Sequence, residues 1–261
     1  MFEKQIGINI REVSHKLIEK PNQSVYFNHI HHHCELLLFL SGAASYNIDG
    51  QIFRPVPYDL LFIPAATYHY LIPNDAVAYE NYVIGIDPSF LPPEQYKKLF
   101  SAPLLLNVKE DAELLSFFTR LDFYDKHYTE KDFDACAESL IREITTYCAY
   151  RKDALNAKRS EALTYTEKIA RYIMAHLEEE IDAERIARHF LLSRSYVQNL
   201  FSEQMHIGLK KYVMQKKIYA AEADIRRGIS PTAAAEKYAF SDYSVFYRLY
   251  KKTFGVSPRQ K

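Results

Sequence analysis

The sequence lacks the features that would indicate a secreted or membrane-bound protein. No stretch approaches the ~18 apolar residues of a membrane span, and the longest apolar run covers only residues 36–40. The first residues, MFEKQIGINIREV, contain no apolar signal-peptide core. The three cysteines are an odd number and form no CxxC pair, which argues against a secreted disulfide framework. We therefore expect a reduced, cytoplasmic protein that has no membrane partner.

Common catalytic motifs and net charge are also missing. The sequence contains no Walker A loop, no GxSxG and no HExxH. Lys and Arg together number 33, as do Asp and Glu, so the formal net charge is zero. Residues 181–261, however, hold 15 basic against 7 acidic residues, a local +8, and residues 1–180 hold 18 against 26, a local −8. The basic C-terminal part predicts contact with a polyanion there.

The distribution of proline indicates strands first and helices afterwards. A chain of 261 residues suits about two domains, and nine of its 11 prolines precede residue 104. Short strand-like stretches with turns between them, including the hairpin signal Asp49-Gly50, predict an antiparallel barrel or sandwich over residues 1–105. These stretches cover residues 35–40, 45–48, 51–53, 59–63, 68–72 and 78–86.

Histidines are concentrated at the start of this region. In an extended strand His29, His31 and His33 point to one side, and Glu35 follows His31 after three residues. The pattern His-x-His-x-x-x-Glu, with Gly42 after six further residues, resembles the first motif of the cupins. The segment from Pro64 to His69 resembles the second motif, with Ala66 and Tyr58 in place of the family's glycines.

The cupin resemblance implies a barrel whose interior carries a ligand site. In metal-binding cupins the equivalents of His29, His31, Glu35 and His69 hold a metal ion, so a metal-dependent enzyme or a metal sensor stays open. We favour an effector pocket lined by the same four residues, Tyr46 and Tyr82, and we expect no cofactor. The two tyrosines could equally be packing residues.

Two amphipathic helices are predicted after the β-domain. Apolar residues recur at helical spacing over residues 113–121 and over residues 133–150. In the second helix one face carries six side chains that suit a protein core. These faces could pack on the barrel or on a second subunit, so residues 106–152 are a candidate dimerisation segment. Residues 153–163 are polar and weakly patterned, and we interpret them as a linker.

The last hundred residues, 164–261, predict an all-α domain with two helix-turn-helix units. Asp182 and Ser193 are candidate N-caps in the first unit, and Asp242 begins the second helix of the second. Both second helices have one apolar and one polar face, as a reader of the DNA major groove requires. Residues 209–226 form a helix between them, about 27 Å long, that ends near Gly228. That length is close to the separation of successive major-groove faces, about 34 Å.

Residues 239–258, AFSDYSVFYRLYKKTFGVSP, resemble the signature of the AraC/XylS family, with Ala239 in place of Gly and Tyr250 in place of Phe. The expected fold class is therefore α+β with two domains, a cupin-like β-barrel with helices and an all-α DNA-binding domain. The resemblance implies a dimeric transcription regulator, not an enzyme, that binds double-stranded DNA and a small-molecule effector such as a sugar. RNA polymerase would be a further partner if it is an activator.

The resemblance also places the DNA contacts on the second helix of each unit. Any one charged residue among them could instead be ordinary solvated surface. The residues expected to contact DNA are Arg194, Ser195, Gln198, Asn199, Tyr243, Ser244, Tyr247 and Arg248.

Overall fold

The computed structural model describes residues 1–21, 28–73, 77–152 and 164–259. The expected linker, residues 153–163, lies outside the described residues. The chain divides into two compact units. The N-terminal unit comprises residues 1–48 and 52–162, and the C-terminal unit comprises residues 163–261 together with residues 49–51.

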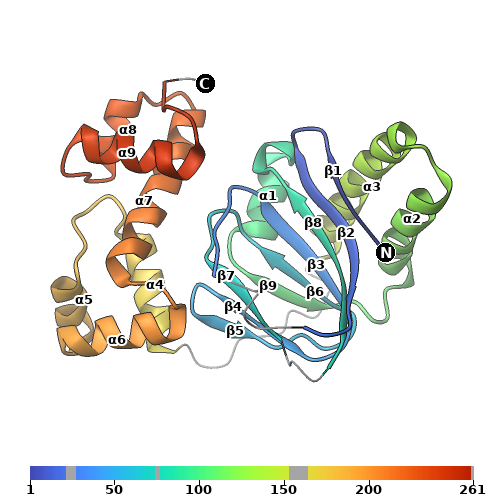
Figure 1. Ribbon diagram of the computed structural model, residues 1–261, viewed down its shortest axis with the longest axis horizontal. Helices are drawn as coiled ribbons and strands as arrows, with labels where there is room; N and C mark the ends of the chain where they lie inside the picture. The colour runs from blue at the N-terminus through green and yellow to red at the C-terminus, as the bar shows by residue number, and fades with distance from the viewer. Residues whose placement is uncertain (22–27, 74–76, 153–163, 260–261) are drawn as a thin grey trace. The chain divides into compact units, whose positions relative to one another are not determined.

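The N-terminal unit contains two β-sheets (Figure 1). The larger has six strands in the order β1-β2-β8-β3-β6-β9, joined in antiparallel pairs, and the smaller has three in the order β5-β4-β7. The expected antiparallel β-domain is confirmed, but β1, β2 and β9 were not predicted. The strands are β1 (Phe2–Ile6), β2 (Ile10–Ile18), β3 (Cys34–Ser41), β4 (Ala44–Ile48), β5 (Gln51–Phe53), β6 (Asp59–Ile63), β7 (His69–Pro73), β8 (Tyr79–Ile86) and β9 (Leu104–Asn107).

Strand β3 is buried on both of its faces. Leu36 and Leu38 belong to an apolar cluster shared with helices, whereas Leu37 and Phe39 belong to a second cluster that includes residues of the small sheet. A strand with two covered faces needs apolar residues at every position, because alternate side chains point to opposite sides. This explains the uninterrupted run at residues 36–40.

Helices cover one face of the six-stranded sheet (Figure 1). They are α1 (Pro93–Phe100), α2 (Ala112–His127) and α3 (Glu130–Arg151), preceded by a short 3-10 helix, η2 (Pro88–Phe90). The apolar face predicted on residues 133–150 is buried within this unit, where each large aliphatic side chain contributes about 1.5–3 kcal/mol. That face is therefore used for packing on the sheet. Its residues are Phe133, Ala137, Leu140, Ile141, Ile144 and Cys148.

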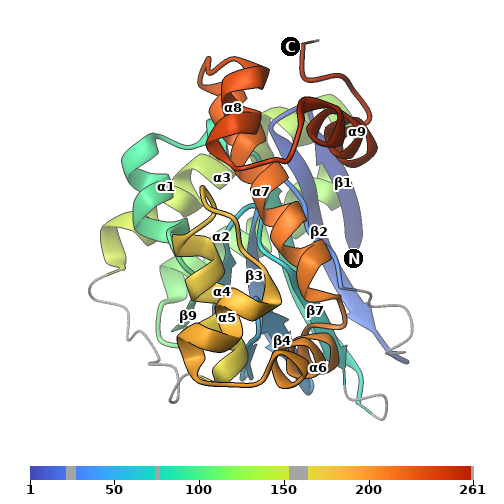
Figure 2. The same cartoon turned by 90° about the vertical axis from the view of Figure 1, so that its left-hand side faces the viewer.

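The C-terminal unit is helical. Its helices are α4 (Tyr165–Ala175), α5 (Ala183–Phe190), α6 (Arg194–Met205), α7 (Leu209–Arg226), α8 (Pro231–Lys237) and α9 (Tyr243–Phe254). Helix α7 has the predicted length, and Gly228 follows it with a φ of +98°. Figure 2 shows α5 and α6 near one end of α7, and α8 and α9 near its other end. Among the described helices, none is long and apolar enough to cross a membrane.

The helix starts follow the predicted capping chemistry. The side chains of Asp182, Ser193 and Asp242 each accept a hydrogen bond from the third amide of the helix they begin. Thr164 and Glu167 form a reciprocal capping box at the start of α4. These caps fix where α6 and α9 begin, and so they fix which of their residues face solvent.

Buried polar contacts tie both halves of the C-terminal unit to α7. The ammonium of Lys217 donates to the backbone oxygen of Glu179, at 2.7 Å, on the side of the first half. On the other side, the carboxylate of Glu222 accepts from the hydroxyl of Tyr250 in α9. Asp224 accepts from Tyr238, just after α8. Each contact satisfies a buried polar group, so α7 holds the two helix-turn-helix units in defined positions.

Candidate functional site

Helices α6 and α9 occupy equivalent positions in two copies of one motif. Val197 and Phe201 are fully buried in α6, and Phe246 and Tyr250 are fully buried in α9. The buried pair of α9 follows that of α6 by 49 positions, as the N-cap Asp242 follows the N-cap Ser193. The same face of each helix therefore packs inward, and the same face of each is left outside.

The turn before each of these helices has the same backbone form. Leu191 and Ala239 both adopt a left-handed conformation, with φ of +56° and +51°. The next amide returns to the preceding helix in both copies, because Leu192 N donates to Ala187 O at 2.9 Å and Phe240 N to Ala235 O at 3.1 Å. Ala187 and Ala235 are buried, as expected for helices that cross closely.

The structure brings the predicted DNA contacts into four matched positions. Counted from the N-cap, they are the first, second, fifth and sixth residues of α6 and of α9. All four on α6 are exposed, as are Ser244 and Arg248 on α9, whereas Tyr243 and Tyr247 are half-buried. The hydroxyl oxygen of Tyr243 is buried, so its ring rather than its polar atom faces outward. The matched pairs are Arg194 with Tyr243, Ser195 with Ser244, Gln198 with Tyr247, and Asn199 with Arg248.

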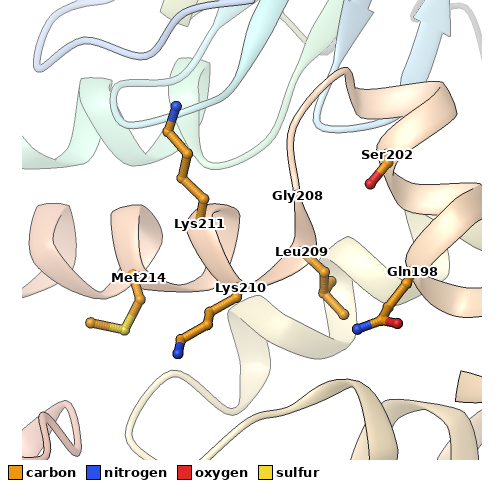
Figure 3. A pocket seen from close by; sticks show the side chains of 7 residues that line it. All are labelled: Gln198, Ser202, Gly208, Leu209, Lys210, Lys211 and Met214. Carbon is orange, nitrogen blue, oxygen red and sulfur yellow. The ribbon is translucent and has the colours of Figure 1, made fainter. Parts of the chain in front are cut away.

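A cavity of about 600 Å³ lies between α6 and the start of α7 (Figure 3). Gln198 and Ser202 line it from α6, and Lys210, Lys211 and Met214 line it from α7. The two lysine side chains leave α7 in opposite directions (Figure 3). The first turn of α7 contains no acidic residue. Lys210 and Lys211 therefore give positive charge to the surface around the cavity, which suits a nearby phosphate.

The second candidate site is a cluster of His29, His31, Glu35 and His69 in the N-terminal unit. One possible donor atom from each lies within 4.8 Å of those of the others. Strand β3 supplies Glu35 and β7 supplies His69. Backbone hydrogen bonds hold the histidine segment, because His29 and His69 exchange two bonds of 3.1 Å and Ala66 N donates to His31 O at 2.8 Å.

Two of these histidines have a defined tautomer. Nδ1 of His31 lies 2.8 Å from the backbone oxygen of His33, and Nδ1 of His69 lies 2.9 Å from that of Thr67. A carbonyl oxygen can only accept, so Nδ1 carries the proton in both rings. Their Nε2 atoms face Glu35, at 3.0 Å for His31 and 3.3 Å for His69. Hydrogen bonds of this kind orient the histidines of metal sites.

The donor set fits a divalent transition metal ion. Imidazole nitrogen and carboxylate oxygen are ligands that Zn²⁺, Fe²⁺, Ni²⁺ and Mn²⁺ accept. Donors that bind one ion at about 2.0–2.2 Å lie no more than about 4.4 Å apart. The spread within the cluster is only slightly larger, so small side-chain movements would complete the coordination.

Electrostatics of the cluster agree with ligand binding. Burial alone would raise the pKa of Glu35, but the imidazoles of His69, His31 and His33 hold that pKa well below its usual range. Burial lowers the pKa of His31, and the Glu35 carboxylate opposes only part of this effect. Near neutral pH the cluster therefore offers an ionised carboxylate. A bound metal ion would take the place of the proton between Nε2 of His31 and Glu35, because a metal ligand must be deprotonated.

The structure separates the two tyrosines that were predicted to line the pocket. Tyr46 pairs with Leu71 two positions from the pair of Ile48 and His69, so it shares the inner face of the small sheet with His69. Tyr82 lies on the helix-covered side of the six-stranded sheet. Its ring stacks on His15 and its hydroxyl donates to Asp122. Tyr82 therefore does not face the space between the two sheets, where Tyr46 lies.

Sequence reasoning did not select three residues that the structure places at these sites. The ring of His33 stacks on His31, with centroids 3.6 Å apart. Asn81 is buried between the sheets, where its amide nitrogen lies 3.5 Å from the hydroxyl of Tyr46. Tyr196 is 47% exposed on α6. The alternation that grouped His33 with His31 was the available signal for the first, and the position of Tyr196 next to Ser195 on the predicted reading helix was the signal for the third.

Two family models match the chain. One, described as an AraC-like ligand binding domain, matches residues 16–121, and the other, described as a helix-turn-helix domain, matches residues 186–261. The chain belongs to the AraC/XylS family. In this AraC/XylS chain the first match contains the histidine cluster, and the second contains both α6 and α9. The matched relatives are regulatory proteins, which agrees with the expectation of a regulator rather than an enzyme.

Individual AraC/XylS relatives resemble parts of the chain. The regulatory protein PocR of Salmonella typhimurium is 32% identical over 59% of this chain and 56% of its own length. The Msm operon regulatory protein of Streptococcus mutans is 24% identical over 40% of this chain and 38% of its own. The chain therefore spans about half the length of PocR. It spans less than half the length of the Msm operon regulatory protein.

Solved structures include ToxT of Vibrio cholerae with an unsaturated fatty acid bound, at 12% identity and a TM-score of 0.39 over 98% of this chain and 95% of that one. The C-terminal domain of AraT of Geobacillus stearothermophilus has 19% identity and a TM-score of 0.36, over 38% of this chain and 85% of that one.

Proposed function

We propose that the chain is a cytoplasmic transcription regulator that binds a specific sequence of double-stranded DNA as a homodimer. A small-molecule effector that binds the N-terminal unit would control this binding. RNA polymerase would be a further partner where the regulator activates transcription.

The observation that supports DNA reading is the repeated outer face of α6 and α9. One matched position carries an exposed side chain that can hydrogen-bond to base edges in both helices, Asn199 on α6 and Arg248 on α9, and the exposed Gln198 adds another on α6. Arg248 is suited to guanine and the two amides are suited to adenine. Helix α7, about 27 Å long, lies between the two helix-turn-helix units, and its length is comparable with one helical turn of DNA, about 34 Å.

Selection of binding sites from random duplex DNA, with the purified chain at two salt concentrations, tests this proposal. We expect an enriched motif with two elements about one helical turn apart. Affinity should fall steeply between the two salt concentrations, because bound phosphates release counterions. Weak binding without any sequence preference at either salt concentration would contradict the proposal.

Variants of the reading helices sharpen the same experiment. Arg248→Ala should lower affinity for the selected site by about 10- to 100-fold and relax the preference at one base pair. The matched control is Arg188→Ala, an exposed arginine of α5 outside the reading face, which should leave the preference unchanged. If Arg248→Ala alters neither affinity nor preference, α9 is not a reading helix.

For the effector we propose a small polar molecule such as a sugar. Its hydroxyl groups would hydrogen-bond to the Glu35 carboxylate and the neighbouring histidines. Asn81 supports a ligand between the sheets, because its buried amide oxygen has no hydrogen-bond partner among the described residues. A panel of sugars should change binding to the selected DNA site, and Glu35→Gln should reduce that response. A panel that changes nothing in the wild-type chain would contradict a sugar effector.

A second candidate function is metal sensing, in which His29, His31, Glu35 and His69 bind a divalent transition metal ion as the effector. The fixed tautomers of His31 and His69 and the close donor atoms favour it. Calorimetry with Zn²⁺ and Co²⁺ should show one ion per chain, lost in the double variant His31→Ala, His69→Ala. Absence of binding to the wild-type chain would remove this candidate and leave the DNA-binding proposal untouched.

A further inference from the structure

We propose that His33, which is not one of the four donor residues, is a positioning residue that sets the geometry of His31 and Glu35 for a divalent metal ion. This inference rests on the second candidate function, metal binding by the histidine cluster. It gives a role to His33, which the motif of metal-binding residues does not include.

The first support is the double contact between His33 and His31. The backbone oxygen of His33 accepts from Nδ1 of His31 at 2.8 Å, which fixes that tautomer. The two rings also stack almost in parallel, with an interplanar angle of 3° and centroids 3.6 Å apart. One contact fixes the protonated atom of His31, and the other fixes the plane of its ring, so Nε2 has one direction available.

The second support is the position of the His33 ring beside Glu35. Its Nε2 atom lies 3.6 Å from Oε1 of Glu35, the same oxygen that His31 approaches at 3.0 Å. Two imidazoles on one oxygen leave Oε2 directed at His69, whose Nε2 lies 3.3 Å away. His33 thus helps to orient the carboxylate as well as the ring of His31.

The third support is the space that Gly85 provides. Gly85 of β8 pairs with Glu35 of β3, so its backbone lies beside Glu35 on the neighbouring strand. A Cβ atom at Gly85 would lie 2.9 Å from Cδ2 and 3.2 Å from Nε2 of His33. Any side chain at residue 85 would therefore displace the His33 ring, and the absence of one lets the ring lie where it contacts both His31 and Glu35.

His33 acts through its neighbours rather than as a fifth ligand. Its Nε2 atom approaches Oε1 of Glu35, whereas among the described residues the donor atoms that lie within 4.8 Å of one another belong to His29, His31, Glu35 and His69. Loss of an outer-shell partner of this kind typically lowers metal affinity by about 10- to 100-fold without removing the site.

Titration of the full chain with Co²⁺, followed by calorimetry and by the visible ligand-field spectrum, tests the inference. In His33→Ala we expect affinity about 10- to 100-fold lower at one ion per chain, with the wild-type spectrum at saturation. Gly85→Ala should reproduce this loss by moving the ring, and His33→Phe should recover most of it because the stacked ring is kept. His32→Ala, the neighbouring histidine outside the cluster, is the matched control and should bind like the wild type.

The possible outcomes distinguish a positioning role of His33 from direct ligation and from the absence of metal binding. Wild-type affinity in His33→Ala would overturn the positioning role, as would failure of His33→Phe to recover binding. A changed ligand-field spectrum in His33→Ala, like that of His31→Ala, would make His33 a ligand and overturn the inference as stated. If the wild-type chain binds no Co²⁺, metal binding itself is wrong and the inference falls with it. Circular dichroism of each variant confirms that the compared chains are folded.

Discussion

At the scale of single residues, the backbone has a left-handed conformation at three positions where the family motifs have glycine and this chain has another residue. Tyr58, Ala66 and Ala239 stand at such positions, and their φ angles are +68°, +56° and +51°. A side chain in the left-handed region costs about 1–2 kcal/mol. Neighbouring contacts therefore hold these turns, as the bond from Ala66 N to His31 O shows beside the histidine cluster.

Ala239→Gly should stabilise the C-terminal unit by about 1 kcal/mol, because glycine removes the steric cost of the left-handed turn. Urea unfolding of the full chain measures the change in the free energy of unfolding. The matched control is Ala233→Gly, at an exposed position inside α8, which should destabilise by about 0.5–1 kcal/mol. Equal destabilisation by both substitutions would mean that the turn at residue 239 carries no strain.

Gly42 shows the opposite case, in which glycine cannot be replaced. Its φ is +103°, and an added Cβ would lie 2.3 Å from the backbone oxygen of Ala78. Gly42→Ala should therefore destabilise the N-terminal unit by about 2–4 kcal/mol, through backbone strain and a clash with rigid backbone. At Gly208 an added Cβ would have no atom within 4 Å other than those of its chain neighbours. Gly208→Ala should therefore change stability by less than about 1 kcal/mol. Similar thermal unfolding of both variants would contradict this account.

At the scale of elements, Asp224 links α7 to the end of α8. It is buried and accepts hydrogen bonds from Lys237 at 2.8 Å and Tyr238 at 2.9 Å. Burial by itself would raise the pKa of Asp224, but these hydrogen bonds outweigh it and lower that pKa below its ordinary value. A lowered pKa in the folded chain contributes stability above the unfolded-state pKa, about 3.9, and this contribution is lost as the pH falls through the folded-state pKa.

Asp224→Asn should therefore cost about 1–3 kcal/mol at pH 7, and the difference from the wild type should shrink as the pH falls below about 4. Urea unfolding curves at a series of pH values measure this difference directly. Glu236→Gln, an exposed carboxyl of α8, is the matched control and should show little change at any pH. A cost that stays constant from pH 7 to pH 3 would mean that ionisation of Asp224 contributes nothing.

Local signals predicted most of the C-terminal elements. The caps at Asp182, Ser193 and Asp242 and the glycine after α7 are encoded within a few residues, so they could be read directly. The sheets were harder, because pairing joins distant segments. Strand β1 carries Glu3, Lys4 and Gln5 between two apolar ends, and only its pairing with β2 makes it a strand.

The candidate sites divide in the same way. The spacing of His29, His31 and Glu35 and the second motif at His69 predicted the cluster, which the structure brings together. The face on which Tyr82 lies could not be predicted. Strand β8 is buried on both sides, so its apolar residues do not follow the alternation that would reveal which side chains share a face. The contact between His33 and Gly85 depends on the register of β3 with β8, which no local pattern encodes.

At the scale of the whole molecule, zero net charge conceals two opposite halves. Residues 181–261 carry a formal charge of +8, and residues 1–180 carry −8. The C-terminal part would by itself attract DNA from any sequence, because phosphate neutralisation dominates non-specific binding. The opposite charge of the acidic part should weaken this attraction through its long-range field, so the whole chain should show less non-specific affinity than its DNA-reading part.

Residues 164–261, expressed alone and confirmed as folded by circular dichroism, should therefore bind random duplex DNA more tightly than the full chain at low salt. The difference should vanish as salt rises, because the Debye length falls from about 30 Å at 0.01 M to about 3 Å at 1 M. Fluorescence anisotropy over this range measures both affinities. Equal affinities at the lowest salt would show that the acidic half exerts no influence, whereas a difference that persists at high salt would point to a direct contact instead of a long-range field. The expected convergence would mean that charge asymmetry suppresses binding to arbitrary DNA and leaves selection of the operator to the faces of α6 and α9.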